Sequence, residues 1–197
     1  DQDYLVAALE KLGPSFVGVT QLPATVSDDE LIRLDAKGVR AVRFNLKRGG
    51  SEGVGHLKDF SERVYRLVGW HAELYVDSRE LPDLFDTLVN LPAVSIDHLG
   101  LSREGLPTLL RLAEKGVRVK ATGFGRVDFD VGQALKDIHS ANPSSLMFGT
   151  DLPSTRAPRP FTVDDTRLVI DALGPEAAAR VFRGNASVFY RTGSNRR

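Results

Sequence analysis

Short apolar runs alternate along this chain with longer stretches in which apolar residues recur every three or four positions. Each short run is rich in valine or aromatic residues and is bounded by Gly, Pro or polar residues, a pattern typical of buried β-strands. These runs predict strands at Phe16–Gln21, Ala41–Asn45, Trp70–Val76, Val94–Asp97, Val117–Thr122 and Leu146–Gly149.

The longer stretches have the spacing of amphipathic helices. The predicted helices are Tyr4–Lys11, Asp28–Lys37, Leu57–Val68, Glu80–Leu91, Gly105–Lys115, Val131–His139, Val163–Leu173 and Glu176–Tyr190. Ser27 stands where an N-cap is expected, and Pro175 suits the first position of the last helix. Alternating strands and helices predict a parallel sheet built through right-handed crossovers.

Such a sheet is either doubly wound or closed into a barrel, and the glycine pattern bears on the choice. No GxGxxG fingerprint follows any predicted strand, and Gly123-Phe124-Gly125 is only a fragment of one. The glycines between Gly49 and Gly53 lack the lysine of a P-loop. The glycine pattern therefore argues against nucleotide binding. In a barrel, chemistry lies at the carboxyl ends of the strands, which is where this sequence places its unusual polar residues.

Composition narrows the class of protein. The chain has 197 residues, with 26 Lys and Arg against 26 Asp and Glu, so its charge gives no reason to expect nucleic acid or an anionic membrane as partner. The absence of cysteine excludes a disulfide framework and a thiolate metal site. No apolar run approaches the roughly 20 residues of a membrane helix, and we expect a cytoplasmic protein.

The second and third predicted strands carry buried-looking polar side chains. An arginine in an apolar strand is costly unless it meets an anion. Arg43 therefore either pairs with a neighbouring carboxylate or clamps a substrate carboxylate, helped by Arg48 in the next loop. His71, Glu73 and Tyr75 share one face of the third strand. We expect His71 and Glu73 to be satisfied within the core and Tyr75, nearest the carboxyl end, to contact a ligand.

Three further candidates follow the later strands. His98 comes directly after the fourth strand, and we expect it to act at the site. Arg126 is either a solvated loop arginine or a second cation at the mouth of the barrel. Asp151 lies just past the last strand and is the strongest catalytic candidate, because a carboxylate there can serve as general base on a bound water or as a metal ligand.

Several of these segments, taken in order, resemble a known family. They are Arg43-Phe44-Asn45-Leu46, Trp70-His71-Ala72-Glu73-Leu74, Asp97-His98-Leu99-Gly100, Gly149-Thr150-Asp151-Leu152-Pro153 and Asn185-Ala186-Ser187-Val188-Phe189-Tyr190. The chain resembles the amidohydrolase-related TIM barrels, and within them the 2-pyrone-4,6-dicarboxylate lactonase-like hydrolases. The resemblance implies that Asp151 is the general base, that His98 polarises a lactone carbonyl, and that Arg43, Arg48 and Arg126 hold substrate carboxylates beside Tyr75.

One family feature is absent. The first strand of the family carries His-x-His, which occurs nowhere among His56, His71, His98 and His139. We therefore expect an α/β fold, namely a (β/α)8 TIM barrel of the metal-dependent hydrolase type that lacks its first two strands. Six of the eight strands are predicted in this sequence. Residues 1–190 would form this single, N-terminally incomplete domain, and residues 191–197 a basic C-terminal tail. The length is short of the roughly 250 residues usual for such barrels.

The expected function is hydrolysis of a carboxylate-bearing lactone by Asp-activated water. Alternatives on the same barrel are a lactone isomerase, a metal-dependent decarboxylase, or a catalytically incomplete fragment. We expect no cofactor, and a divalent metal only if the missing His-x-His is present, since His98 and Asp151 alone give too few ligands. The expected partner is a small-molecule carboxylate or lactone, with neither nucleic acid nor membrane. Exposed edge strands also predict a homodimer or poor solubility.

Overall fold

Six parallel strands form one sheet in the computed structural model, which describes residues 2–192. The strands are β1 (Gly18–Thr20), β2 (Val39–Asn45), β3 (His71–Tyr75), β4 (Val94–Ile96), β5 (Arg118–Ala121) and β6 (Leu146–Phe148). Each strand pairs in parallel with the next one along the chain. Five of them lie within their predicted ranges and β2 begins two residues before its range, so the expected parallel α/β pattern is confirmed.

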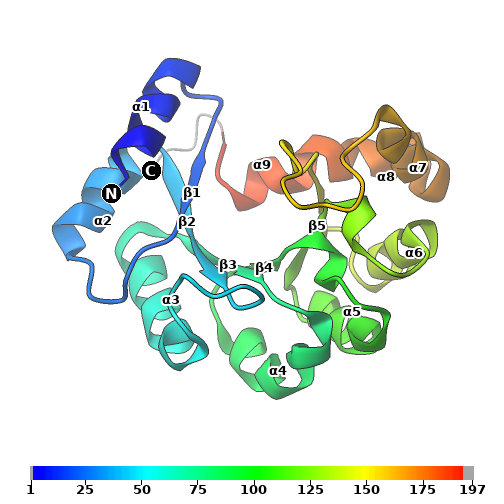
Figure 1. Ribbon diagram of the computed structural model, residues 1–197, viewed down its shortest axis with the longest axis horizontal. Helices are drawn as coiled ribbons and strands as arrows, with labels where there is room; N and C mark the ends of the chain where they lie inside the picture. Colours follow the sequence, from blue (N-terminus) through cyan, green and yellow to red (C-terminus); the bar gives the residue numbers. More distant parts are fainter. Residues whose placement is uncertain (1, 193–197) are drawn as a thin grey trace.

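The helices return the chain between the strands and lie on the outside of the curved sheet (Figure 1). They are α1 (Asp3–Leu12), α2 (Asp28–Ala36), α3 (Val54–Val68), α4 (Leu81–Asn90), α5 (Leu106–Glu114), α6 (Val131–Ala141), α7 (Val163–Leu173), α8 (Pro175–Ala179) and α9 (Asn185–Phe189). Short 3₁₀ turns at Ser78–Glu80 and Arg103–Gly105 precede α4 and α5. Pro175 begins α8 as predicted, and the Ser27 hydroxyl caps α2 by accepting from the Glu30 amide.

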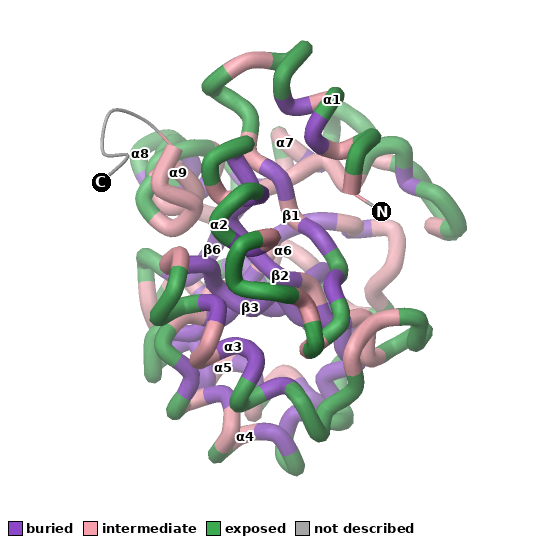
Figure 2. The backbone as a smooth tube through the Cα atoms, turned by 90° about the vertical axis from the view of Figure 1, so that its left-hand side faces the viewer, coloured by how far each residue is buried: buried purple, intermediate pink, exposed green. Residues whose placement is uncertain are grey.

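The apolar core lies between the sheet and its covering helices. Leu31 and Leu34 of α2 and Leu109 and Leu112 of α5 are fully buried against it, which is the apolar stripe expected of amphipathic helices. Figure 2 shows the same division, with β2 and β3 buried at the centre and exposed backbone along the outer sides of the helices. The inner face of the sheet is different, because charged side chains fill much of it.

The C-terminal segment is helical over 175–189, close to the helix predicted over Glu176–Tyr190, but its winding changes part-way. A π-helical turn at Arg180–Gly184 separates α8 from α9. Directly after this turn, the Asn185 amide donates to the carbonyls of Pro143 and Leu146. These two bonds fix α9 against the start of β6, so tertiary contacts anchor the segment at the point where the helix changes its winding.

The sheet curves as part of a TIM barrel but does not close. In residues 2–192, β1 and β6 each pair on one side only, and Figure 1 shows the opening between β1 and the segment that carries α8 and α9. All six strands run the same way, so their carboxyl ends meet at one edge of the sheet. None of the helices in residues 2–192 has the length and apolar character needed to cross a membrane.

Candidate active site

An open cleft of about 290 Å³ lies where the carboxyl ends of the strands meet. Its lining residues are Gln21, Arg43, Asn45, Arg48, Tyr75, His98, Arg126 and Asp151. The structure therefore brings together every residue that the sequence nominated for the site. They come from separate strand ends and loops spread over more than half of the chain, and only the folded sheet makes them neighbours.

Asp151 and His98 face each other across this cleft. The Oδ1 atom of Asp151 lies 3.9 Å from Nε2 of His98, which is too long for a hydrogen bond but short enough for one water to contact both atoms. Both residues have left-handed backbone, with φ of 58° at Asp151 and 51° at His98. Non-glycine residues held in this region store strain, which often marks functional sites.

The ring of His98 is held from behind by the strand end of β5. Its Nδ1 lies 2.8 Å from the hydroxyl of Thr122. Burial lowers the pKa of His98 below its usual value, so the ring is neutral at physiological pH. When Thr122 donates to Nδ1, the ring proton stands on Nε2 and points toward the cleft. Gly123 makes room for this arrangement, since a Cβ there would lie 2.7 Å from Nδ1.

Arg126 is paired with the candidate base. Its Nε donates to Oδ2 of Asp151 at 2.6 Å, and its Nη2 donates to the carbonyl of Thr155 at 3.1 Å. Of the two readings of Arg126 left open by the sequence, the structure places it at the mouth of the barrel rather than in solvent. The pair leaves Oδ1 of Asp151 as the oxygen that faces His98.

Beneath the cleft, two cations and two carboxylates form a buried cluster, here called the inner tetrad: Arg43, Glu73, Asp97 and Lys120. Arg43 lies 3.3 Å from Glu73 and 2.5 Å from Asp97, the latter an ion pair rather than an aligned hydrogen bond. Lys120 Nζ lies 2.5 Å from Glu73 and 3.4 Å from Asp97. The Tyr190 hydroxyl also donates to Glu73, at 3.0 Å.

Burial and charge act against each other within the inner tetrad. Burial opposes ionisation of Glu73, but the charges of Lys120 and Arg43 prevail and lower its pKa to about 2. Burial raises the pKa of Asp97, and the nearby charge of Glu73 adds to this effect. Burial alone would favour neutral Lys120, yet Glu73 and Asp97 raise its pKa well above the usual range. The tetrad is therefore held together by its charges.

Sequence reasoning missed Lys120. The signal was present, because Arg118, Lys120 and Thr122 alternate with small or apolar residues along a buried strand and so share one face. It also missed Gln21, whose only signal is its place just past β1. Glu73 is satisfied within the interior as expected, whereas Nε2 of the buried His71 has no hydrogen-bond partner among residues 2–192. His71 instead stacks against Phe189 and Tyr190 of the C-terminal segment.

The loop after β2 presents Arg48 to the cleft. The Arg48 guanidinium lies over the Tyr75 ring, 5.5 Å from its centre, and its amide donates to Oδ1 of Asn45 at 3.2 Å. The neighbouring Lys47 binds the buried Asp77 at 2.7 Å. Hydrogen bonds from Arg79, and then from Lys47, lower the pKa of Asp77 far below its usual value. This contact anchors the loop from beneath.

The donor set does not fit a divalent metal. In the described part of the chain, no group of three or more His, Asp or Glu side chains is placed to hold one. Asp151 is taken by Arg126, and the carboxylates of the inner tetrad are taken by Arg43 and Lys120. Cationic side chains thus stand against the oxygens that a metal would need.

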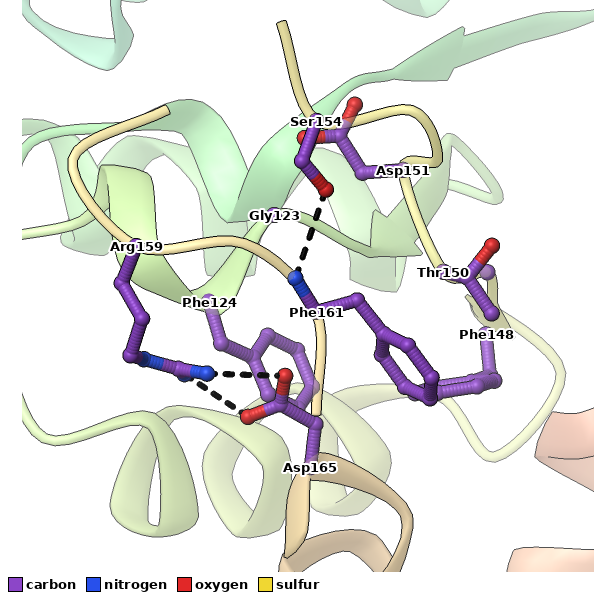
Figure 3. A pocket seen from close by; sticks show the side chains of 10 residues that line it. Gly123, Phe124, Phe148, Thr150, Asp151, Ser154, Arg159, Phe161 and Asp165 are labelled. Atoms are coloured by element: carbon purple, nitrogen blue, oxygen red, sulfur yellow. Dashed lines mark hydrogen bonds and ion pairs between the residues drawn. The ribbon is translucent and has the colours of Figure 1, made fainter. Parts of the chain in front are cut away.

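A second, much smaller cavity lies on the other side of the Asp151 loop (Figure 3). Its volume of about 10 Å³ is room for roughly one water. Beside it, Arg159 holds Asp165 at 2.7 Å, and the Phe161 amide donates to the Ser154 hydroxyl at 3.3 Å. These contacts fasten the loop that carries Asp151 to the start of α7.

Arg191, the first residue of the predicted tail, lies against the body of the domain. Its guanidinium donates to the carbonyl of Val68 at 3.2 Å and lies 3.8 Å from Asp35. The rest of that tail, residues 193–197, lies outside the described residues.

The comparisons with known proteins agree with the fold. The sequence model of the amidohydrolase family matches residues 1–192. The chain belongs to the amidohydrolase family. A 2-pyrone-4,6-dicarboxylate hydrolase from Comamonas testosteroni is 34% identical to this amidohydrolase over 103 residues, which make up 51% of the chain and 33% of that relative. The chain thus spans about a third of the curated relative it matches.

Solved structures resemble this amidohydrolase over most of its length. A protein from Pseudomonas putida that carries the name 2-pyrone-4,6-dicarboxylic acid hydrolase is 25% identical, with a TM-score of 0.80, covering 98% of this chain and 78% of its own. A protein of the same name from Acinetobacter baumannii, solved with citric acid bound, is 19% identical, with a TM-score of 0.79, covering 97% and 79%. A protein from Agrobacterium tumefaciens is also 19% identical, with a TM-score of 0.83, covering 98% and 76%. The last two likenesses show the fold alone.

Proposed function

We propose that this amidohydrolase opens a carboxylate-bearing lactone by hydrolysis, with Asp151 as the general base. The observation that carries the proposal is the pair of Asp151 Oδ1 and His98 Nε2, 3.9 Å apart in a cleft lined by three arginines. A carboxylate and a neutral imidazole that can share one water suit the activation of that water beside a polarised carbonyl. The names of the Comamonas and Pseudomonas relatives support a lactone as substrate.

In the proposed reaction, Asp151 and His98 have separate roles. Oδ1 of Asp151 takes a proton from the water as its oxygen attacks the lactone carbonyl carbon. The carbonyl oxygen gains negative charge, which a hydrogen bond from Nε2 of His98 stabilises. The ring C–O bond then breaks, and the proton held by Asp151 passes to the departing oxygen. The product is the ring-opened hydroxy acid or its keto form, and Asp151 is restored.

The arginines supply the attraction for an anionic lactone. Guanidinium groups pair with carboxylates through parallel hydrogen bonds, which orient the substrate as well as bind it. We propose that the group that binds a substrate carboxylate lies among Arg43, Arg48 and Arg126, which all line the cleft, with Tyr75 lying beside the first two. The cleft volume of about 290 Å³ is compatible with a small lactone.

The test is hydrolysis of 2-pyrone-4,6-dicarboxylate and of sugar lactones by the wild type, Asp151→Asn and the exposed control Asp171→Asn. We expect Asp151→Asn to lower kcat by about 10²- to 10⁴-fold, the usual contribution of a general base, and the control to match the wild type. Loss of lactone is followed by ultraviolet absorbance and acid release by pH-stat. Unchanged hydrolysis by Asp151→Asn would remove Asp151 from this role.

A further inference from the structure

The three arginines of the cleft differ in what already balances their charge. From this difference we infer that the substrate is a lactone with a single carboxylate, that Arg48 binds this carboxylate, and that Arg126 is a positioning residue for Asp151. The inference rests on the proposed function for the reaction, but it makes a separate claim about binding.

The charge of Arg43 is balanced by buried carboxylates inside the protein. Its guanidinium contacts Glu73 at 3.3 Å and Asp97 at 2.5 Å, and these carboxylates are almost wholly buried. With Lys120, the inner tetrad has two positive and two negative groups and is electrically balanced. Drawing Arg43 toward a substrate carboxylate would leave Asp97 short of a partner in a buried place, which is strongly unfavourable. Arg43 can still donate a hydrogen bond to an uncharged substrate oxygen.

The charge of Arg126 is balanced by Asp151. The Nε–Oδ2 distance is 2.6 Å, and both side chains are largely buried. The guanidinium is also fixed by the Thr155 carbonyl, and its Cδ lies so close to Gly123 that a Cβ there would be 2.9 Å away. This packing turns Oδ1 of Asp151 toward His98. A substrate carboxylate on Arg126 would compete with Oδ2 of Asp151 for the guanidinium, and so would weaken the ion pair that orients the base.

Arg48 is the arginine of the cleft that stays uncompensated. In residues 2–192 its guanidinium has no carboxylate partner and contacts the face of the Tyr75 ring, 5.5 Å from its centre. The neighbouring amide groups of Gln21 and Asn45 also line the cleft. An exposed guanidinium on an aromatic face, with amides beside it, is suited to a carboxylate on a flat ring.

The lining residues and the inner tetrad beneath them together carry one surplus positive charge. The inner tetrad sums to zero, Arg126 cancels Asp151, and Arg48 remains. One carboxylate therefore neutralises the cleft. A second one would have to break the Arg126–Asp151 pair or the Arg43–Asp97 pair, and the carboxylate left behind would lose its charged partner.

Binding of ring-matched acids tests the carboxylate count without any turnover. Titration calorimetry with benzoate and isophthalate compares one carboxylate with two on the same flat ring. We expect isophthalate to bind no more than 3-fold tighter than benzoate, and Arg48→Gln to weaken benzoate by about 10- to 100-fold. The control Arg167→Gln, on the exposed side of α7, should bind as the wild type does. Tenfold tighter isophthalate, absence of benzoate binding, or an Arg48→Gln variant that binds normally would overturn the inference.

Kinetics on a graded set of lactones tests the role of Arg126. The substrates are 2-pyrone, 2-pyrone-6-carboxylate and 2-pyrone-4,6-dicarboxylate. We expect Arg48→Gln to raise KM for the carboxylates and leave neutral 2-pyrone unchanged. Arg126→Gln should lower kcat by the same factor on the neutral and the monocarboxylate lactone, with partial rescue by Arg126→Lys. A loss confined to carboxylate substrates and to KM would make Arg126 a clamp and refute its positioning role.

The two proposals fail in different ways. If the wild type opens none of these lactones, the proposed function fails, and the calorimetric comparison still decides how many carboxylates the cleft accepts. If the lactones are opened but the dicarboxylate is the best substrate by kcat/KM, the proposed function stands and the single-carboxylate inference is wrong. Urea midpoints of each variant show that the folded state is retained.

Discussion

Replacing Lys120 with methionine tests the reasoning about the inner tetrad most directly. The change keeps most of the volume of the side chain and removes its charge, which lies 2.5 Å from Glu73 and 3.4 Å from Asp97. Two buried carboxylates would then share Arg43 alone. The exposed Lys136 of α6 offers a matched control, since Lys136→Met removes a charge that solvent already screens.

The expected loss of stability is large. Removing one partner from a buried ion cluster costs about 3–5 kcal/mol, because the remaining charge is left without compensation. The lowered pKa of Glu73 gives an independent figure of the same order. A change from the usual 4.5 to about 2 corresponds to about 3 kcal/mol of stabilisation by its neighbours. We therefore expect Lys120→Met to lose about 3 kcal/mol of unfolding free energy at pH 8.

The pH dependence of this loss has a definite sign. In the wild type, the folded-state pKa of Glu73 lies below its unfolded value, so its stabilisation is complete above about pH 5 and is lost as the pH falls toward 2. Without Lys120, only Arg43 opposes the effect of burial, and the pKa of one of the two carboxyls rises above its unfolded value. The folded variant then holds a proton that the unfolded chain releases. The difference in unfolding free energy between the wild type and the variant should therefore be smallest at pH 5 and largest at pH 8.

Urea unfolding followed by circular dichroism at pH 5, 6.5 and 8 measures this difference. Comparison is made between the wild type, Lys120→Met and Lys136→Met at each pH. A loss below about 1 kcal/mol at pH 8, or a loss that does not change between pH 5 and pH 8, would refute the account of the inner tetrad as a set of mutually dependent charges.

Further changes test other parts of the structure. Gly123→Ala places a Cβ 2.7 Å from His98 Nδ1 and 2.9 Å from Arg126 Cδ, at a position whose φ is 60°. We therefore expect kcat to fall at least tenfold in the lactone assay, and the unfolding free energy to fall by about 1 kcal/mol. Burial lowers the pKa of His71 to about 3, so the ring stays neutral in the folded state while it takes up a proton in the unfolded chain. The unfolding free energy of the wild type should therefore fall by about 2 kcal/mol between pH 6.5 and 4.5, and that of His71→Leu should fall less, as measured by urea titration. Arg159→Met removes the ion pair with the buried Asp165, so it should lower the urea midpoint and, through the Asp151 loop, lower kcat as well. A normal kcat would show that the loop does not need this ion pair.

Local patterns were enough to predict the elements. All six strands were located because short valine-rich runs between Gly, Pro and polar residues have few other stable states than a buried strand. The Ser27 cap and the start of α8 at Pro175 were confirmed for similar local reasons. The last helix was predicted with nearly its observed extent, but its π-helical turn at Arg180–Gly184 was not, because that turn is next to the Asn185 bonds to Pro143 and Leu146, about 40 residues away in the chain.

The sequence by itself determined the parallel α/β pattern and the set of polar residues at the strand ends. Tertiary structure alone decided how those residues pair. Arg43 meets Glu73 and Asp97, and Arg126 meets Asp151, because strand register and loop packing bring them within a few ångströms. The energy of an ion pair depends steeply on distance and burial, neither of which a linear sequence contains. The sequence nominated Arg43, Arg48 and Arg126 alike, but the fold pairs the first and the last with carboxylates. In residues 2–192, Arg48 is left as the uncompensated arginine of the cleft.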